Sequence, residues 1–316
     1  MKAIDKSLFF KESVDSIFGK YFMYDLDIYG NLMFIDIFGD SVVHKVPVKN
    51  FISFSKNIAS VIVRDTSIFS YIPERDKLIK ITFNNDFLIT EVDSIDLNDS
   101  YNRRRYTINT NFGQPFQLIN GKFYFPLKSK NKNSRFIDDY CFLEVTYSNG
   151  KVSTNKKVPT PNEYTEQKRR SPISLLFPYA SGQSVCFYHS IDRVTLLNAK
   201  MDTIKNVDFN PFAAYEEYDY SQHKDFGYIR YYEETNEANY EFLFNKGFTI
   251  IIKKAKSKSI NEEVHYEYLV LDKNFHLARF DSIPHKINPY VSFSYKGGFV
   301  LMDQTLKYGY YYKINL

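Results

Sequence analysis

The clearest chemical signal in this sequence is a pair of basic segments that also carry, or lie near, tyrosine. Arginine beside tyrosine binds carboxylate or sulfate through paired hydrogen bonds and ring stacking. We therefore expect an anionic ligand, which could be a charged glycan, an acidic peptide or a protein partner. The candidate residues are Tyr101, Arg103, Arg104, Arg105 and Tyr106 in the first segment, and Lys168, Arg169 and Arg170 in the second.

A third segment, residues 215–225, is acidic and rich in tyrosine. It could be a lid, an acidic partner for the basic segments or a long insertion, and we favour the lid because so many aromatic side chains rarely stay fully solvated. Two carboxylates brought together in space would suit glycoside hydrolysis, so a carbohydrate-active enzyme, a glycoside hydrolase or lyase-like protein, is the alternative to simple binding. The ligand-binding candidates here are Tyr218, Tyr220 and His223, and the carboxylates are Glu216, Glu217, Asp219 and Asp225.

Other catalytic and metal-binding patterns are missing from the sequence. The six histidines show neither HxH nor HExxH spacing, and Cys141 and Cys186 have neither CxxC spacing nor histidines nearby. We therefore expect no metal and no cofactor, with both cysteines buried as small apolar residues. Because GxSxG, P-loop and GxGxxG motifs are also absent, we lean toward a protein that is not an enzyme.

The composition narrows the class of protein further. With 41 Lys and Arg against 37 Asp and Glu in 316 residues, the net charge of +4 is too small to indicate nucleic-acid binding. No stretch approaches the roughly 18 apolar residues of a membrane helix, and the first 12 residues lack the apolar core of a signal peptide. We expect a monomer that is either cytosolic or begins after a removed leader.

The sequence pattern predicts that the elements positioning these residues are β-strands. Short apolar runs bounded by Gly, Asn, Asp or Ser recur along the chain, which predicts an all-β protein. Six tight hairpins recur, and the length divided by six is about 53 residues, the size of a four-stranded propeller blade with its loops. The six hairpins span residues 21–37, 61–72, 116–126, 175–188, 240–252 and 291–302.

A second kind of hairpin follows, at residues 78–95, 142–158, 194–209 and 268–283, and predicts the outer two strands of a blade. Residues 92–95 and 280–283 both end such a strand in Asp-Ser-Ile, and residues 14–17 have the same form. We therefore expect residues 6–17 to be an outer strand that completes the last blade and covers its edge. The prediction is a single closed six-bladed β-propeller of antiparallel four-stranded blades, one domain over residues 1–316.

A family resemblance supports this fold. Residues 27–36, DIYGNLMFID, followed by VVHKV at 42–46, resemble the repeat of NHL-type and TolB-like six-bladed propellers, and LIKI at 78–81 looks like the last element of that repeat. The chain is most similar to uncharacterised secreted or lipid-anchored bacterial propellers. The resemblance implies a six-bladed fold and an extracytoplasmic location, periplasmic or at the cell surface, rather than an activity. From the printed sequence we expect neither the leader nor the lipid-attachment cysteine of that group in this chain.

The propeller topology determines on which face of the molecule the charged segments lie. The connections between blades and the loops between second and third strands share one face, and the tight turns lie on the other. The basic segments, the basic residues of 128–135 (Lys128, Lys130, Lys132 and Arg135) and the lysines of 253–258 would therefore gather on one face around the central channel, where cations attract anions. We expect a non-enzymatic binding propeller that uses this face; the alternative is that these charges are ordinary solvated surface.

Overall fold

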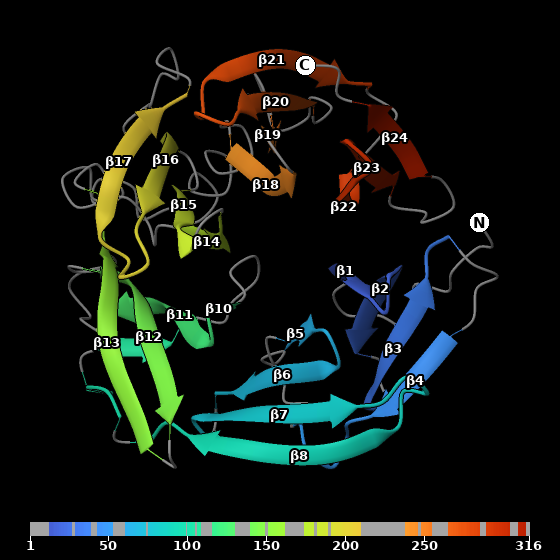
Figure 1. Ribbon diagram of the computed structural model, residues 1–316, viewed down its shortest axis with the longest axis vertical. Coiled ribbons are helices and arrows are strands. Elements are labelled where there is room, and N and C mark those ends of the chain that lie inside the picture. The colour runs from blue at the N-terminus through green and yellow to red at the C-terminus, as the bar shows by residue number, and fades with distance from the viewer. Residues whose placement is uncertain are drawn as a thin grey trace, which may run out of the picture.

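A computed structural model of the chain describes residues 13–313 except 27–28, 39–42, 53–60, 74, 99, 105, 109–115, 130–139, 149–150, 162–173, 180–181, 189–190, 210–237, 246–247, 255–264, 285–288 and 304–308. Within these residues the chain forms 24 strands and no α-helix, and none of its elements is a helix that could cross a membrane. The strands form six antiparallel sheets arranged in a ring, with the chain running from one sheet to the next (Figure 1).

In each sheet, strands that are consecutive in sequence pair side by side. The first sheet contains β1 (Ser13–Ile17), β2 (Lys20–Leu26), β3 (Asn31–Asp36) and β4 (Val43–Pro47). The second contains β5 (Val61–Arg64), β6 (Ser67–Ile72), β7 (Lys77–Phe83) and β8 (Ile89–Asp96). The third contains β10 (Gln117–Ile119), β11 (Lys122–Ser129), β12 (Tyr140–Ser148) and β13 (Lys151–Pro159), and β9 (Tyr106–Ile108) also pairs with β11.

The other three sheets follow the same order. The fourth contains β14 (Ser174–Pro178), β15 (Ser184–Tyr188), β16 (Ile191–Leu197) and β17 (Thr203–Asp208). The fifth contains β18 (Ala238–Asn245), β19 (Phe248–Lys254), β20 (Tyr266–Asp272) and β21 (Leu277–Ile283). The sixth has three described strands, β22 (Pro289–Tyr295), β23 (Gly298–Asp303) and β24 (Gly309–Lys313).

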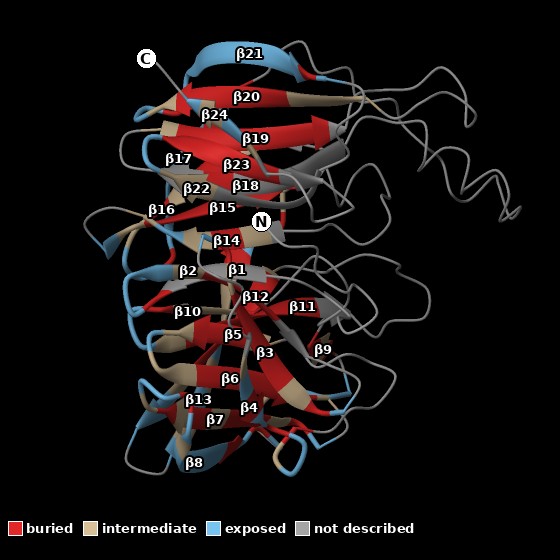
Figure 2. Ribbon diagram, turned by 90° about the vertical axis from the view of Figure 1, so that its right-hand side faces the viewer, coloured by how far each residue is buried: buried red, intermediate tan, exposed pale blue. Residues whose placement is uncertain are grey.

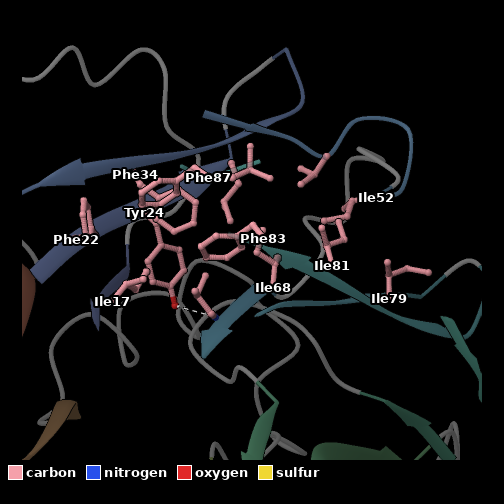
Figure 3. Close-up of a cluster of buried hydrophobic side chains, with 14 of the residues drawn as sticks. Ile17, Phe22, Tyr24, Phe34, Ile52, Ile68, Ile79, Ile81, Phe83 and Phe87 are labelled. Atoms are coloured by element: carbon pink, nitrogen blue, oxygen red, sulfur yellow. Dashed lines mark hydrogen bonds between the residues drawn. The ribbon is translucent and has the colours of Figure 1, made fainter. Parts of the chain in front are cut away.

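The hydrophobic core lies between neighbouring sheets. Five buried clusters join the first sheet to the second, the second to the third, and so on to the sixth. In the first cluster, Phe22 and Phe34 from one sheet face Phe83 from the next (Figure 3). Middle strands are therefore apolar on both faces, whereas the outer strand β21 is exposed along most of its length (Figure 2).

The structure confirms the all-β class and most of the predicted hairpins. The predicted hairpins at 61–72, 116–126, 175–188, 240–252 and 291–302 are the first two strands of sheets two to six. The four predicted outer hairpins are the third and fourth strands of sheets two to five. Tight local turns and apolar runs were sufficient to locate these pairs, because both signals lie within a short stretch of sequence.

The prediction for the N-terminal strand is wrong for the part that the structure describes. Ser13–Ile17 pairs with β2 and is the first strand of the first sheet, so it does not complete the last one. The hairpin at 21–37 is consequently formed by the second and third strands. The turn that joins β1 to β2 is Phe18-Gly19, with φ angles of 51° and 74°. Such two-residue turns usually carry Asn-Gly, so phenylalanine at the first position hid the signal. Residues 6–12 lie outside the described residues.

Candidate functional site

The ends of the sheets that carry the connections form what we call the link face, described at residues 48–52, 73, 75–76, 97–98 and 100–104. A buried aspartate organises part of it. Asp76, in the loop between β6 and β7, is 0% exposed and has a φ of 52°, which aspartate tolerates better than most residues. Its carbonyl oxygen accepts a hydrogen bond from the backbone N–H of Leu97 at 2.8 Å. The loop is thereby joined to the link that follows β8.

Three side chains converge on the Asp76 carboxylate. The Tyr71 hydroxyl donates to Oδ1 at 2.6 Å, and the Tyr101 hydroxyl donates to the same oxygen at 3.4 Å. The Arg103 Nε lies 3.2 Å from Oδ2, close enough for an ion pair although it does not make a well-aligned hydrogen bond to that oxygen. A buried carboxylate needs this kind of compensation, because it has lost its contact with water.

A second contact positions the Arg103 guanidinium. Its Nη1 donates to Oδ1 of Asn98 at 2.7 Å, and Asn98 Nδ2 donates to the carbonyl oxygen of Arg75 at 3.3 Å. The Arg103 side chain nevertheless remains 46% exposed. Arg103 is therefore held at a defined place on the link face while part of its guanidinium still meets solvent.

The two tyrosines at this carboxylate remain protonated donors at neutral pH. Burial, with a further contribution from the charge of Asp76, raises the pKa of Tyr101 to about 12. Burial and the hydrogen bond to Asp76 raise the pKa of Tyr71 as well. Both groups therefore stabilise the carboxylate and are poorly suited to act as acids or bases.

The two predicted tyrosines of the first basic segment are structural. Tyr101 packs against the cluster between the second and third sheets, and Tyr106 is buried within that cluster. The Tyr106 hydroxyl accepts a hydrogen bond from Lys156 Nζ at 3.1 Å, and the same ammonium lies 5.0 Å above the Tyr106 ring and 5.1 Å above the Tyr140 ring. A tyrosine buried in this way has little surface left to offer a ligand.

The arginines of the predicted site are divided between two situations. Arg103 is bound to Asp76 and Asn98, whereas Arg104 is exposed next to it. Arg75, also exposed, precedes Asp76, and its backbone carbonyl oxygen accepts the hydrogen bond from Asn98 Nδ2. The sequence did not single out Arg75 or Asp76, because Pro-Glu-Arg-Asp at 73–76 looks like an ordinary polar turn. The predicted residues that lie outside the described residues are Arg105, Lys168, Arg169, Arg170, Tyr218, Tyr220 and His223.

One part of the predicted basic face is corrected. Lys253 was expected in an exposed loop, but it lies inside β19 and is only 2% exposed. Lys128 likewise lies within β11. The strands extend further than their apolar runs suggest, because backbone pairing continues beyond the last large apolar residue.

The described residues contain no group of three or more His, Cys, Asp or Glu side chains arranged to hold a metal ion. The buried Glu144 accepts hydrogen bonds from the Tyr124 hydroxyl at 2.8 Å and from Lys122 Nζ at 3.3 Å, which satisfies it as a structural residue. The carboxylates of the acidic segment, Glu216, Glu217, Asp219 and Asp225, lie outside the described residues.

Comparisons with known proteins show the fold. No protein-family model and no curated protein matches the sequence. A DUF4221-family protein from Bacteroides vulgatus is 11% identical, with a TM-score of 0.64 over 96% of this chain and 90% of that chain. A Bacteroides fragilis protein described as exported is 12% identical, with a TM-score of 0.54 over 95% and 81%. Virginiamycin B lyase from Staphylococcus aureus is 8% identical, with a TM-score of 0.48 over 100% and 88%. The first two likenesses, with the ring of sheets, show that this chain has a β-propeller fold.

Proposed function

We propose that this chain is a six-bladed β-propeller, a single domain over residues 1–316, that binds an anionic ligand or partner at its link face without catalysing a reaction. The proposal fits a fold whose connecting loops are commonly its binding surface. We also propose an extracytoplasmic location. The resemblance to secreted propellers supports it, as does the structural likeness to a Bacteroides fragilis protein described as exported.

One observation carries the binding proposal, namely the fixed orientation of a half-exposed arginine. Asp76 and Asn98 hold the Arg103 guanidinium. The exposed Arg75 lies in the loop that carries Asp76, and the exposed Arg104 lies in the link that carries Arg103. An arginine that is already oriented loses less side-chain entropy when it binds a carboxylate or sulfate. We call this set of three arginines, Arg75, Arg103 and Arg104, the arginine corner.

The arginine corner can be tested with polyanion binding. The probes are heparin, which carries sulfate, and polygalacturonate, which carries only carboxylate. The double variant Arg75→Gln/Arg104→Gln removes two positive charges without touching the residue that Asp76 needs. We expect its affinity for the preferred polyanion to fall by roughly tenfold at low salt, and binding by the unaltered protein to weaken as salt rises.

A matched control separates the corner from general charge. Lys205, exposed on the outer strand β17, is changed to Gln, alone and together with Lys151→Gln at the exposed start of β13. The double control has the same net charge as the arginine variant and should bind like the unaltered protein. Equal binding by the arginine variant and the control, or binding that does not respond to salt, would remove the arginine corner from the proposal.

A further inference from the structure

The junction between the first and sixth sheets brings the beginning and the end of the strand order side by side. The strand β1 lies next to β22 there, while β1 pairs with β2 and β22 pairs with β23. As between the other sheets, no described strand is shared, so contacts between side chains must hold the first and sixth sheets together.

Aromatic side chains meet at this junction, at the end of the ring that carries the turns 18–19 and 296–297. Tyr295, at the end of β22, stacks on Phe38, which follows β3, with ring centroids 4.7 Å apart and an interplanar angle of 28°. Tyr21 of β2 meets Tyr295 edge to face at 5.4 Å. Tyr311 of β24 also meets Tyr295 edge to face, at 6.0 Å. Tyr295 is thus the centre of a four-ring group that spans both sheets.

Polar contacts fix the members of this group. The Tyr311 hydroxyl donates to the carbonyl oxygen of Lys296 at 2.8 Å, and Lys296 Nζ lies 5.1 Å from the centre of the Tyr295 ring. On the other side, the Phe38 backbone N–H donates to Asp36 Oδ1 at 3.1 Å. The backbone on each side of the junction is therefore held in place to present its ring.

The buried side chains at the same junction include two methionines. Phe22 and Phe34 pack toward the second sheet, so by strand alternation Met23, Met33 and Ile35 face the other way, as Tyr21 does. All three are buried. Methionine is flexible and fits irregular gaps, so it specifies a fixed packing less firmly than branched or aromatic residues.

We infer that the ring is closed here by an aromatic clasp, formed by Tyr21, Phe38, Tyr295 and Tyr311, and that this junction opens before the other five. Phe38 is 54% exposed and Tyr311 is 47% exposed, so each gains only part of the free energy of full burial. Two of the three buried residues named above are methionines, whereas the cluster between the first and second sheets consists of branched and aromatic side chains. Opening at the clasp separates the first and last sheets while each neighbouring cluster stays intact.

The test is hydrogen exchange measured along the full chain. In the unaltered protein, backbone amides of β1 and β22 should exchange faster than those of β5 and β14, which are also the first strands of their sheets but lie beside buried clusters on both faces. Phe38→Ala should raise exchange in β1, β2 and β22 by about threefold to tenfold, the range expected for the loss of an aromatic pair, and leave β11 and β12 unchanged.

The control for this variant is Phe280→Ala. Phe280 lies on the outer strand β21 and is also 54% exposed, so it matches Phe38 in residue type and exposure, and it lies outside the clasp. Tyr295→Phe keeps the stacked ring, so exchange in β1, β2 and β22 should stay at the level of the unaltered protein in this variant. Three results would each overturn the clasp: equal effects of Phe38→Ala and Phe280→Ala, a uniform rise in every sheet, or slowest exchange at β1 and β22 in the unaltered protein. If Phe38→Ala does not fold, the comparison of strands in the unaltered protein decides the question.

Discussion

At the scale of single residues, the buried Asp76 gives a structural role to part of the first basic segment. Arg103 and Tyr101 were expected to contact a ligand, and both contact the Asp76 carboxylate. A buried charge that loses the cation paired with it retains the full cost of its desolvation. Arg103 therefore has a structural role that Arg104, exposed beside it, does not share.

A double-mutant cycle measures this structural role. We expect Arg103→Met to lower the free energy of unfolding by about 1–3 kcal/mol, less than for a fully buried pair because Arg103 is half exposed. Combining it with Asp76→Asn should cost less than the sum of the two single changes, since the orphaned charge is then absent. The measurement is denaturant unfolding of the four proteins. Arg104→Met is the control and should change stability by less than about 0.5 kcal/mol. Additive costs would contradict the pairing.

At the scale of elements, three of the outer hairpins share a five-residue turn with the same hydrogen bonds from side chain to backbone. Its first residue, Asn84, Asn198 or Asp272, uses one side-chain oxygen to accept hydrogen bonds from the backbone N–H groups of the third and fifth residues. The fourth residue has a positive φ and is buried in an inter-sheet cluster. Those fourth residues are Phe87, Met201 and Phe275, with φ angles of 60°, 67° and 65°.

This turn inserts an apolar side chain between sheets at the expense of an unfavourable backbone conformation. The Asx side chain offsets that strain by satisfying two backbone donors. The same bonding lowers the pKa of Asp272, chiefly through the hydrogen bond from the His276 backbone. Asparagine serves equally well at this position in the other two turns, so acceptor oxygen rather than charge is what the turn requires.

Removing the acceptor should therefore weaken the turn. We expect Asn84→Ala to lower the free energy of unfolding by about 1 kcal/mol, because the N–H groups of Asp86 and Leu88 lose their acceptor. Asn85→Ala, at the exposed next position of the same turn, should cost less than about 0.5 kcal/mol. Thermal and denaturant unfolding of both variants provide the comparison. Equal costs at the two positions would mean that the side-chain bonds contribute nothing.

At the scale of the whole molecule, stability depends on the contacts between neighbouring sheets. Cys141 of the third sheet and Cys186 of the fourth lie in one buried cluster. Burial raises the pKa of the Cys186 thiol well above its usual range, and the proximity of Cys141 adds to this. Both thiols are therefore chemically inert while these two sheets stay together.

The cysteines report when those sheets separate. We expect neither thiol to react with a small disulfide reagent in the native protein, and both to become reactive in the same denaturant range. The reason is that a single cluster protects both of them. Labelling followed by mass analysis of the peptides gives the rate for each site. Rapid labelling of one cysteine under native conditions would show that the junction between the third and fourth sheets opens locally.

The predictable part of the fold is the part encoded over short distances. The inner hairpins of sheets two to six could be located because Gly, Asn or Asp turns separate short apolar runs. In the first sheet the prediction took the second strand for the first, because the turn between the first two strands, Phe18-Gly19, is of a kind usually made by Asn-Gly. The candidate site was only partly predictable. Arg103 and Tyr101 stood out by type, but the partner that explains them, Asp76, lies about 25 positions earlier in the chain.

The sequence by itself determined the class of fold, because apolar alternation and turn chemistry act between neighbouring residues and predict strands and hairpins locally. Only the tertiary structure decided which sheet receives β1, whether Lys253 is exposed, and whether an arginine serves a ligand or a buried aspartate. Each of these depends on which distant segments pack together in three dimensions. The same packing places Phe38, which follows a strand of the first sheet, against Tyr295 of the sixth.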